Sequence, residues 1–489
     1  MSQLREDVQA IWEQRRAGIL LHPTSLPGDG ETGDLGAAAY YFADFLHDCG
    51  ITAWQMLPLG PTLESGSPYQ CLSVHAGNTG LISLDALVEQ GWLSSAQGAR
   101  DKLLQTARQA FVKVANSHDS ADYANFKYQQ AFWLDDYALF KVLKVHFGNQ
   151  PWWEWPEDFR DRKPAELPRI ARQFAEELEQ QRFEQYLFFR QWRELRAYAN
   201  ERGILLFGDM PIFVAHDSAD VWINQHQFYL DEQGQPIVIA GVPPDYFSAT
   251  GQRWGNPLYN WDRMSENGFL WWVERVRTQL ELFDLIRIDH FRGFEAYWEI
   301  PANEETAING RWVKAPGREL FNTLLEQCRQ LPFVAEDLGI ITPQVEALRD
   351  DYGFPGMKIL QFAFGGDAKN PYLPHNHIRT SVAYTGTHDN NTSLGWYEEC
   401  DEKTQEHLND YLGYPSESMP WPLIRSALAS TSALAVIPMQ DLLELGSEAR
   451  MNTPGTCCGN WDWRFQWSQV NPDLATRMRH LLEQYGRLV

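Results

Sequence analysis

The sequence is poor in cysteine and in long apolar runs, and each shortage excludes a class of protein. Six cysteines among 489 residues form no CxxC pair or metal-ligand spacing, which argues against a disulfide framework or a zinc site. The adjacent Cys457 and Cys458 are a poor framework for bridging, and their role is left open. Free thiols are typical of a reducing cytosol, so we expect a cytoplasmic protein. No run approaches the roughly 18 apolar residues of a membrane helix, and the polar start of the chain lacks an apolar signal core.

Positive charge is also scarce. Lys and Arg number 41 against 65 Asp and Glu, which gives a formal charge of −24. A strongly acidic surface repels nucleic acid and anionic membranes but does not obstruct a neutral polysaccharide. We therefore expect no nucleic-acid and no membrane partner. The sequence has no acidic loop with calcium-ligand spacing, so neither a metal nor an organic cofactor is expected.

Aromatic residues, by contrast, are plentiful. The chain holds 20 Trp, 19 Tyr and 26 Phe. Many of them will fill the core, because a large domain needs bulky side chains. Flat rings also make the stacking platforms that sugar rings prefer, so the composition favours a carbohydrate ligand.

Short β-like runs recur along the chain, each followed by a loop rich in Gly, Pro and Asp and then by helical periodicity. This alternation indicates βα units around a parallel sheet. Eight such runs predict an α/β protein with a (β/α)8 TIM barrel. The expected strands are residues 17–21, 53–57, 204–207, 285–288, 333–335, 358–362, 381–384 and 433–437.

Two connections are too long to be plain loops. We expect one catalytic barrel over residues 1–489, with an inserted subdomain at 61–188 and an inserted substrate-loop region at 210–284. They follow the second and third strands, where long insertions usually build the substrate cleft. The first contains a helical stretch near residues 126–145.

A helix at the end of the first insertion and the last segment of the chain complete the predicted architecture. Phe188, Trp192 and Leu195 have i, i+4, i+7 spacing, which predicts a helix packed on the barrel. After Trp463 only a helical segment remains. We therefore expect no C-terminal β-sandwich domain.

Four acidic residues follow the apolar runs: Asp209, Asp289, Glu336 and Asp389. In a barrel these positions meet at the C-terminal face, where catalytic groups converge. For any single acid the alternative is a helix cap or a salt bridge. Four acids on one rim, three of them with His or Arg beside them, favour a catalytic site.

The residues around these acids resemble a known family. Three segments are similar to signature blocks of the α-amylase superfamily: LIRIDHFRGF at 285–294, VAEDLG at 334–339 and TGTHDN at 385–390. Other segments resemble the amylomaltase and disproportionating-enzyme family, glycoside hydrolase family 77, more specifically. They are SPYQ at 67–70, GDMPIFVAHDSADVW at 208–222, PPDYFSATGQRWGNPLY at 243–259 and ARMNTPG at 449–455. The blocks occur in the family's order, and the resemblance covers about residues 18–464.

The resemblance implies that Asp289 is the nucleophile, Glu336 the general acid/base and Asp389 the transition-state stabiliser. The residues themselves agree with these roles. Arg287, two positions before Asp289 on the same strand face, can keep the nucleophile ionised. Glu336 must be protonated at rest, which requires a raised pKa. Retention also predicts that the carboxyl groups of Asp289 and Glu336 stand about 5–5.5 Å apart.

Three further residues beside these acids are candidate substrate contacts. His290 and His388 can supply hydrogen bonds to sugar hydroxyls, although structural hydrogen bonding is the alternative. Asp209 is similar to the acid on the family's third strand, and a structural role for it stays open.

Aromatic and loop residues complete the expected binding site. Tyr69 offers a ring for stacking at the subsite where cleavage occurs, with core packing as the alternative. Tyr246 and Trp254 lie in a Gly/Pro-rich segment that covers the active site in the similar family. Asn460 and Trp461 are similar to that family's late substrate-side loop. Asn391 stands where the family often has an acid, and we assign it no role.

The function that the resemblance implies is a retaining 4-α-glucanotransferase. It would move α-1,4-glucan segments from a donor maltodextrin, derived from starch or glycogen, to the 4-OH of an acceptor glucan or glucose. A covalent glycosyl-aspartate would carry the segment between them. Two alternatives stay open: an α-1,4-glucan hydrolase on the same scaffold and a catalytically silent glucan-binding protein. The oligomeric state is not predicted.

Overall fold

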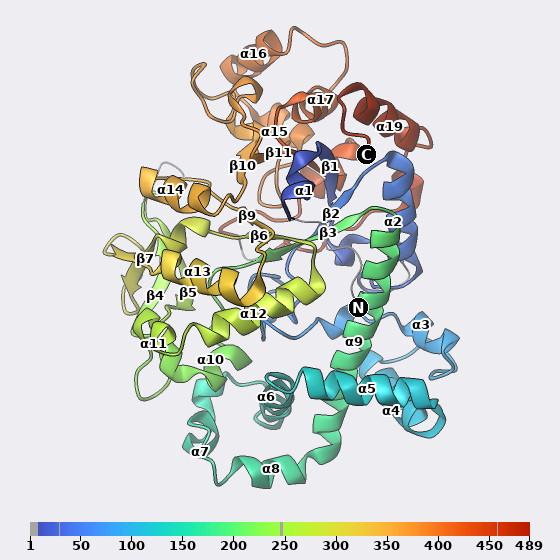
Figure 1. The fold of residues 1–489 in the computed structure, drawn as a ribbon, viewed down its shortest axis with the longest axis vertical. Helices are drawn as coiled ribbons and strands as arrows, with labels where there is room; N and C mark the ends of the chain where they lie inside the picture. Colours follow the sequence, from blue (N-terminus) through green and yellow to red (C-terminus); the bar gives the residue numbers. More distant parts are fainter. Residues whose placement is uncertain (1–7, 29, 245–247, 457) are drawn as a thin grey trace.

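Eight parallel strands close into a barrel in the computed structural model, which describes residues 8–28, 30–244, 248–456 and 458–489. Around the barrel the order is β1-β12-β11-β10-β9-β6-β3-β2, and Figure 1 shows the strands at the centre of the molecule. The predicted (β/α)8 barrel is confirmed. The strands are β1 (Arg16–Leu20), β2 (Ala53–Gln55), β3 (Leu205–Met210), β6 (Leu285–Ile288), β9 (Phe333–Ala335), β10 (Gly356–Ile359), β11 (Ser381–Tyr384) and β12 (Leu434–Pro438).

Apolar side chains on both faces of the strands explain why these runs form a parallel barrel. In β12, Leu434 and Val436 belong to one buried cluster, whereas Ala435 and Ile437 belong to the cluster under the helices. Alternate residues of a barrel strand point inward and outward, so both faces must be apolar. Residues that share the inner cluster come from all around the barrel: Leu20, Ala53, Phe207, Leu285, Val334, Met357, Val382 and Leu434.

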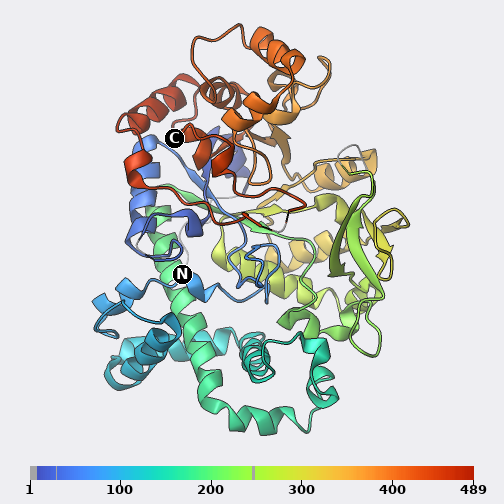
Figure 2. The same cartoon turned by 180° about the vertical axis from the view of Figure 1, so that it is seen from behind.

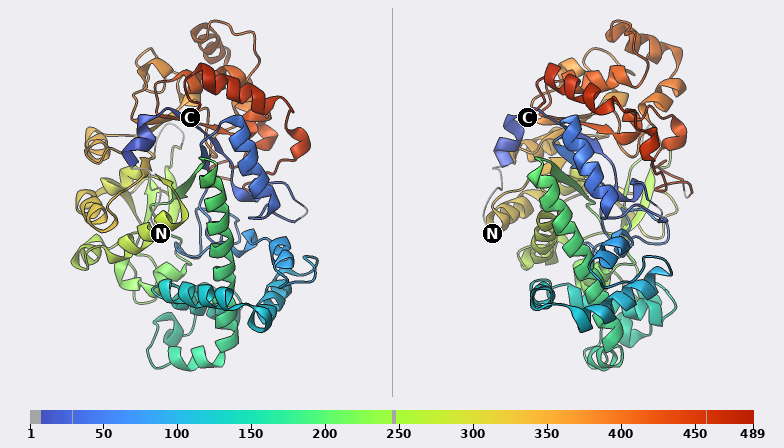
Figure 3. Two further views of the ribbon diagram at one scale, coloured as in Figure 1. Left: turned by 45° about the vertical axis from the view of Figure 1, so that its right-hand side comes forward. Right: turned by 90° about the vertical axis from the view of Figure 1, so that its right-hand side faces the viewer.

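Helices cover the outside of the barrel. The predicted helix through Trp192 is α9 (Ala175–Glu201), and the indole Nε1 of Trp192 donates to the Leu282 carbonyl at 2.9 Å. The C-terminal helix α19 packs beside α2, as Figure 3 shows. The other outer helices are α1 (Val8–Glu13), α2 (Ala37–Cys49), α12 (Leu270–Leu282), α13 (Gly317–Cys328), α14 (Pro343–Asp351), α15 (Ser393–Glu399), α16 (Glu402–Tyr411), α17 (Trp421–Ala429), α18 (Met439–Leu442) and α19 (Leu474–Gln484).

The insertion after β2 is helical, and it lies at one end of the molecule in Figure 1. The stretch expected near residues 126–145 is divided into two helices, because the chain turns between Gln129 and Leu134. Trp133 Nε1 donates to Gln130 Oε1 at 2.7 Å within this turn. The long helix α9 begins in the insertion and ends at the barrel. The helices are α3 (Leu84–Glu89), α4 (Arg100–Val114), α5 (Ser117–Gln129), α6 (Leu134–His146), α7 (Glu157–Arg160) and α8 (Leu167–Gln173).

A second, four-stranded sheet of order β5-β4-β7-β8 stands beside the barrel, and it was not predicted from the sequence. Figure 2 shows its strands together. Strands β4 (Val238–Val242) and β5 (Gln252–Pro257) come from the insertion after β3, which also holds α10 (Ala219–Ile223) and α11 (Trp261–Glu266). Strands β7 (Ala296–Pro301) and β8 (Arg311–Lys314) follow β6, and β7 pairs antiparallel with β4.

The described residues after β12 form no β-sandwich. Their regular elements are helices, as expected from the sequence. Over the same described residues, none of the helices combines the length and apolarity that crossing a bilayer requires.

Candidate active site

Three acids occupy the C-terminal ends of neighbouring strands. Asp209 lies in β3, Asp289 follows β6 and Glu336 follows β9. The backbone N–H of Asp289 donates to the Met210 carbonyl at 3.0 Å, which continues the pairing of β3 with β6. That of Glu336 donates to the Ile288 carbonyl, also at 3.0 Å. The barrel's own hydrogen bonds therefore fix the backbone of both acids.

A buried arginine joins Asp209 to Asp289. Arg287 Nη1 lies 2.7 Å from Asp209 Oδ2, and its Nη2 lies 2.8 Å from Asp289 Oδ1. Burial acts to lower the pKa of Arg287, but the two carboxylates raise it well above its ordinary value. The arginine therefore stays charged. Burial holds the pKa of Asp209 above its ordinary value, although Arg287 acts to lower it. The side chain of Asp289 remains 30% exposed, so part of its carboxylate is open to a ligand.

Glu336 has the opposite electrostatic setting. Burial raises its pKa to about 8; Arg287 opposes the rise and Asp289 adds to it. Glu336 Oε2 accepts the backbone N–H of His290 at 2.7 Å, and Oε1 accepts that of Leu338 at 3.2 Å. His290 has a φ of 50°, a left-handed conformation that non-glycine residues rarely adopt. With a pKa near 8, the carboxyl is mostly protonated at neutral pH.

The four-stranded sheet brings Trp254 to this side of the site. Trp254 lies in β5, and its ring meets the ring of His290 edge-on at 4.9 Å between centroids. Burial lowers the pKa of His290 to about 4, against the attraction of Asp289, so its imidazole is neutral. The predicted partner Tyr246 lies outside the described residues.

Asp389 is held differently from the other acids. It stands in the loop beyond the end of β11, and its side chain is 44% exposed. Asn452 Nδ2 donates to Asp389 Oδ1 at 2.6 Å, and Arg450 Nη2 donates to the Asp389 carbonyl at 2.7 Å. Asn452 and Arg450 were not among the predicted site residues, although both lie in the ARMNTPG segment.

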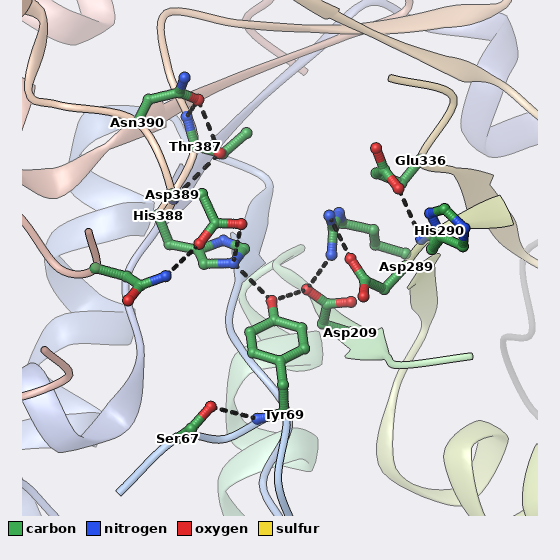
Figure 4. Close-up of polar contacts among 12 residues, drawn as sticks. Ser67, Tyr69, Asp209, Asp289, His290, Glu336, Thr387, His388, Asp389 and Asn390 are labelled. Carbon is green, nitrogen blue, oxygen red and sulfur yellow. Dashed lines mark hydrogen bonds and ion pairs between the residues drawn. The ribbon is translucent and has the colours of Figure 1, made fainter. Parts of the chain in front are cut away.

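Tyr69 and His388 lie between the two groups of acids, as Figure 4 shows. The Tyr69 hydroxyl is 2.7 Å from Asp209 Oδ2 and 2.8 Å from His388 Nε2. Burial and Asp209 raise the pKa of Tyr69 well above its ordinary value, so the hydroxyl keeps its proton and donates it to the carboxylate. His388 Nε2, on the other side of this hydroxyl, also lies 3.4 Å from Asp389 Oδ2.

Aromatic contacts support the same two side chains. The Tyr69 and His388 rings stack at 5.3 Å and 14° between planes. Trp461 tilts against Tyr69, with centroids 5.9 Å apart. Tyr69 is therefore more than a core-packing residue, because its hydroxyl belongs to the polar network of the site.

Two asparagines in nearby loops have structural contacts. Asn460 Oδ1 accepts the Thr453 N–H at 2.8 Å, and its Nδ2 donates to the Thr456 carbonyl at 3.1 Å. These bonds brace the loop, and the predicted substrate contact of Asn460 stays a prediction. Asn391 Nδ2 donates to Glu399 Oε1 at 2.9 Å, so the residue left without a role in the sequence stabilises its own loop.

Comparisons with known proteins agree with this geometry. A sequence model of glycoside hydrolase family 77, described as 4-alpha-glucanotransferase, matches residues 21–470. The chain is 49% identical to a 4-alpha-glucanotransferase from Thermus thermophilus, over 97% of this chain and 99% of the relative. It is 48% identical to one from Synechocystis sp., over 98% and 99%. An amylomaltase from Streptococcus agalactiae in complex with acarbose superposes with a TM-score of 0.92 at 38% identity, over 97% of this chain and 100% of that one.

The resemblance seen in the motifs is therefore confirmed over nearly the full length of the protein. The family match includes the strand-end acids, the Tyr69 segment and the ARMNTPG segment. Taken with the closed barrel, these findings show that the chain belongs to the 4-alpha-glucanotransferase family, glycoside hydrolase family 77.

Proposed function

We propose that this 4-alpha-glucanotransferase acts by a retaining, two-step mechanism with Asp289 as nucleophile and Glu336 as general acid/base. The observation that carries the proposal is the contrast between the two carboxyl groups. Asp289 is paired with a permanent cation at 2.8 Å, whereas burial raises the pKa of Glu336 to about 8. Retaining glycoside chemistry needs one ionised and one protonated carboxyl at the scissile bond.

In the first step, a carboxylate oxygen of Asp289 attacks the anomeric carbon of the donor glucan. The bond from that carbon to the glycosidic oxygen breaks, and Glu336 donates its proton to the leaving oxygen. The leaving chain departs with a free 4-OH. The remaining segment stays on the enzyme as a glycosyl ester of Asp289, and Glu336 is now ionised.

In the second step, the 4-OH of an acceptor sugar replaces the leaving chain. Ionised Glu336 takes the hydroxyl proton while the oxygen attacks the anomeric carbon, and the ester bond to Asp289 breaks. A new α-1,4 bond forms with retained configuration. Asp389 stabilises the positive charge that develops on the sugar ring in both transition states.

The surrounding residues bind the sugar at the cleavage point. We assign Tyr69 and Trp254 to stacking against sugar rings, and His290 and His388 to hydrogen bonds with sugar hydroxyls. Asp209 and Arg287 keep the nucleophile in place through the bonds described above. Tyr246 and Asn460 remain candidates for contacts with the glucan.

The donors and acceptors that we propose are α-1,4-glucans. The relatives are named as 4-alpha-glucanotransferases, and the Streptococcus agalactiae amylomaltase was crystallised with acarbose. Maltodextrins from starch or glycogen fit as donors, with glucose or a second glucan as acceptor. The free cysteines favour a cytoplasmic location, which cell fractionation tests.

Maltotriose tests the reaction, because the enzyme should convert it to glucose and longer maltodextrins without a net gain in reducing ends. If new reducing ends appeared as fast as glucose, water would be the main acceptor. The proposal of glucan transfer would then be wrong. Asp289→Ala should abolish product formation while glucan binding persists. Mass spectrometry of the enzyme with a slowly reacting fluorinated glucosyl donor should find the added mass on the peptide that contains Asp289. In a complex with bound glucan, the two carboxyl groups should stand about 5–5.5 Å apart.

A further inference from the structure

Asp389 lacks the support that the barrel gives to the other two catalytic acids. The backbone N–H groups of Asp289 and Glu336 bond to carbonyls of neighbouring strands at 3.0 Å. Asp389 lies beyond the end of β11, and among the described residues its own N–H bonds only to the side chain of Thr387, at 3.3 Å. Its carboxylate therefore needs another source of fixed orientation.

That source is a segment far along the chain. Arg450 donates from Nη2 to the Asp389 carbonyl at 2.7 Å and from Nε to the Asn452 carbonyl at 2.7 Å. Asn452 in turn donates from Nδ2 to Asp389 Oδ1 at 2.6 Å. One arginine thus fixes the backbone of both partners, and one amide fixes the rotation of the carboxylate.

The segment that carries these donors is itself rigidly placed. Asn452 and the adjacent Met451 are buried, and Met451 packs into the inner barrel cluster. The N–H of Trp461 closes the loop base by donating to the Met451 carbonyl at 2.7 Å. Asn460 braces the same loop through Thr453. The donor of Asn452 is therefore held where Asp389 requires it.

The chemistry of the partner matters as well. Asp289 faces a cation, Arg287, which offsets its charge. The carboxylate of Asp389 accepts from a neutral amide at Oδ1, 2.6 Å away, and His388 Nε2 lies 3.4 Å from its Oδ2. The shorter bond fixes Oδ1 without placing a cation on that oxygen. A donor to a carboxylate stabilises its charged form. A stabiliser of a cationic transition state needs such a charge, fixed in orientation but not neutralised.

We propose that Asn452 is a positioning residue for transfer, which orients Asp389 and keeps its full negative charge directed at the reacting sugar. The inference rests on the role proposed for Asp389. It predicts that an asparagine outside the strand ends controls the rate of the chemical steps, without itself touching the anomeric carbon.

The test compares Asn452→Ala and Asn452→Asp in the full-length enzyme with maltotriose. Losing a hydrogen bond to a charged group costs about 10- to 100-fold in rate, so Asn452→Ala should lower kcat by that factor with KM within about 3-fold. Asn452→Asp is nearly isosteric but puts a like charge beside Asp389. It should lower kcat further and move the acidic limb of the pH–activity profile up by about one unit.

A matched control exists at the opposite end of the barrel. Asn200 Nδ2 donates to Asp284 Oδ2 at 2.9 Å, the same pair of groups away from the catalytic rim. Asn200→Asp should leave kcat and the acidic limb unchanged, even if the melting temperature falls. The positioning role would be overturned if Asn452→Asp kept the acidic limb and kcat of the unmodified enzyme. It would also be overturned if Asn200→Asp shifted the limb equally.

Asp389→Asn separates this inference from the proposed function. If Asp389→Asn is nearly inactive while Asn452→Asp behaves like the unmodified enzyme, only the positioning role is wrong. If Asp389→Asn itself keeps full activity, the role of Asp389 is wrong, and the positioning role that rests on it is wrong with it.

Discussion

The active site has two halves that are built in different ways. One half, Asp289 and Glu336, stands at the ends of strands and takes its geometry from the barrel's backbone hydrogen bonds. The other half, Asp389 with His388 and Tyr69, stands in loops and takes its geometry from side-chain contacts, which Figure 4 shows. Several backbone hydrogen bonds of the barrel hold each strand end in place. In the loops, by contrast, each side chain is oriented by individual side-chain contacts. Changes to the loop half should therefore alter rates gradually, and changes to the strand half should abolish activity or unfold the protein.

The largest expected effect comes from replacing one acid of each half by asparagine, one at a time. Asp289→Asn removes the nucleophile that we propose and should lower kcat/KM for maltotriose by about 10⁴-fold or more. Asp389→Asn removes only the stabilising charge that we propose and should lower it by about 10²- to 10³-fold. Asp44→Asn, at a surface pair with Arg202, serves as the control and should stay near the original value. A greater loss for Asp389→Asn than for Asp289→Asn would reverse the comparison.

Arg287 provides the second test, because it is the one side chain that joins Asp209 to Asp289 through both of its terminal nitrogens. Arg287→Gln leaves Asp209, which is fully buried, without its cation. Removing one partner of a buried ion pair costs about 3–5 kcal/mol, so the free energy of unfolding measured in urea should fall by that amount. Retention of both stability and activity would show that the pair does not hold the strand half together.

The pH dependence of Glu336 is the third test. Its pKa is raised from 4.5 to about 8, so the activity that needs the protonated acid should fall as the pH rises through about 8, seen in the basic limb of kcat/KM. The folded protein also binds this proton more tightly than the unfolded chain does. The stability it provides is therefore full below pH 4.5 and is lost as the pH rises towards 8.

Glu336→Gln keeps the shape of this side chain without its charge. It should raise the melting temperature relative to the unmodified enzyme at pH 9 but not at pH 4.5, with a difference in unfolding free energy of about 5 kcal/mol at the higher pH. Calorimetry at the two pH values measures it. An equal difference at both values would mean that the carboxyl is not harder to ionise in the folded protein.

The smallest expected effect belongs to the hydroxyl that links the two halves. Tyr69→Phe keeps the ring but removes the oxygen that contacts Asp209 and His388. Loss of these two hydrogen bonds, at about 1 kcal/mol for each, should lower kcat by about 30-fold. Tyr198→Phe removes a hydroxyl of α9 that donates to Asp44 of α2, and its kcat should not change. A loss as large as that of Asp389→Asn would mean that the halves are coupled more strongly than single contacts imply.

The same division explains what could be predicted from the sequence. The barrel strands and the acids that end them were predictable, because an apolar run followed by an acid is a local pattern. Strand β10 was expected at 358–362 but occupies Gly356–Ile359, since Leu360–Phe362 turns into a short 3₁₀ helix. Leu360 in this turn is buried and Phe362 is apolar although exposed, so apolar residues alone did not mark the strand's end.

Contacts between distant segments were not predictable in this way. Asn452 meets Asp389 across 63 positions of sequence, and no local pattern in ARMNTPG indicates which side chain it faces. The four-stranded sheet was missed because its strand β5 resembles a loop in the sequence. Gly251 precedes this strand and Gly255 lies within it, and glycines of this kind usually indicate turns. Its pairing partners come from another connection of the barrel, which only the folded chain brings near.

The four-stranded sheet also has a consequence for the order of folding. Strands β4 and β7 belong to connections that leave different barrel strands, β3 and β6. The paired residues Val238 and Pro301 are 63 positions apart, whereas Phe207 and Leu285, paired between β3 and β6, are 78 apart. Closing the β4–β7 ladder therefore costs no more loop entropy than closing the barrel at β3 and β6. Trp254 is carried by this sheet, so during refolding its contact with His290 should form no later than this part of the barrel.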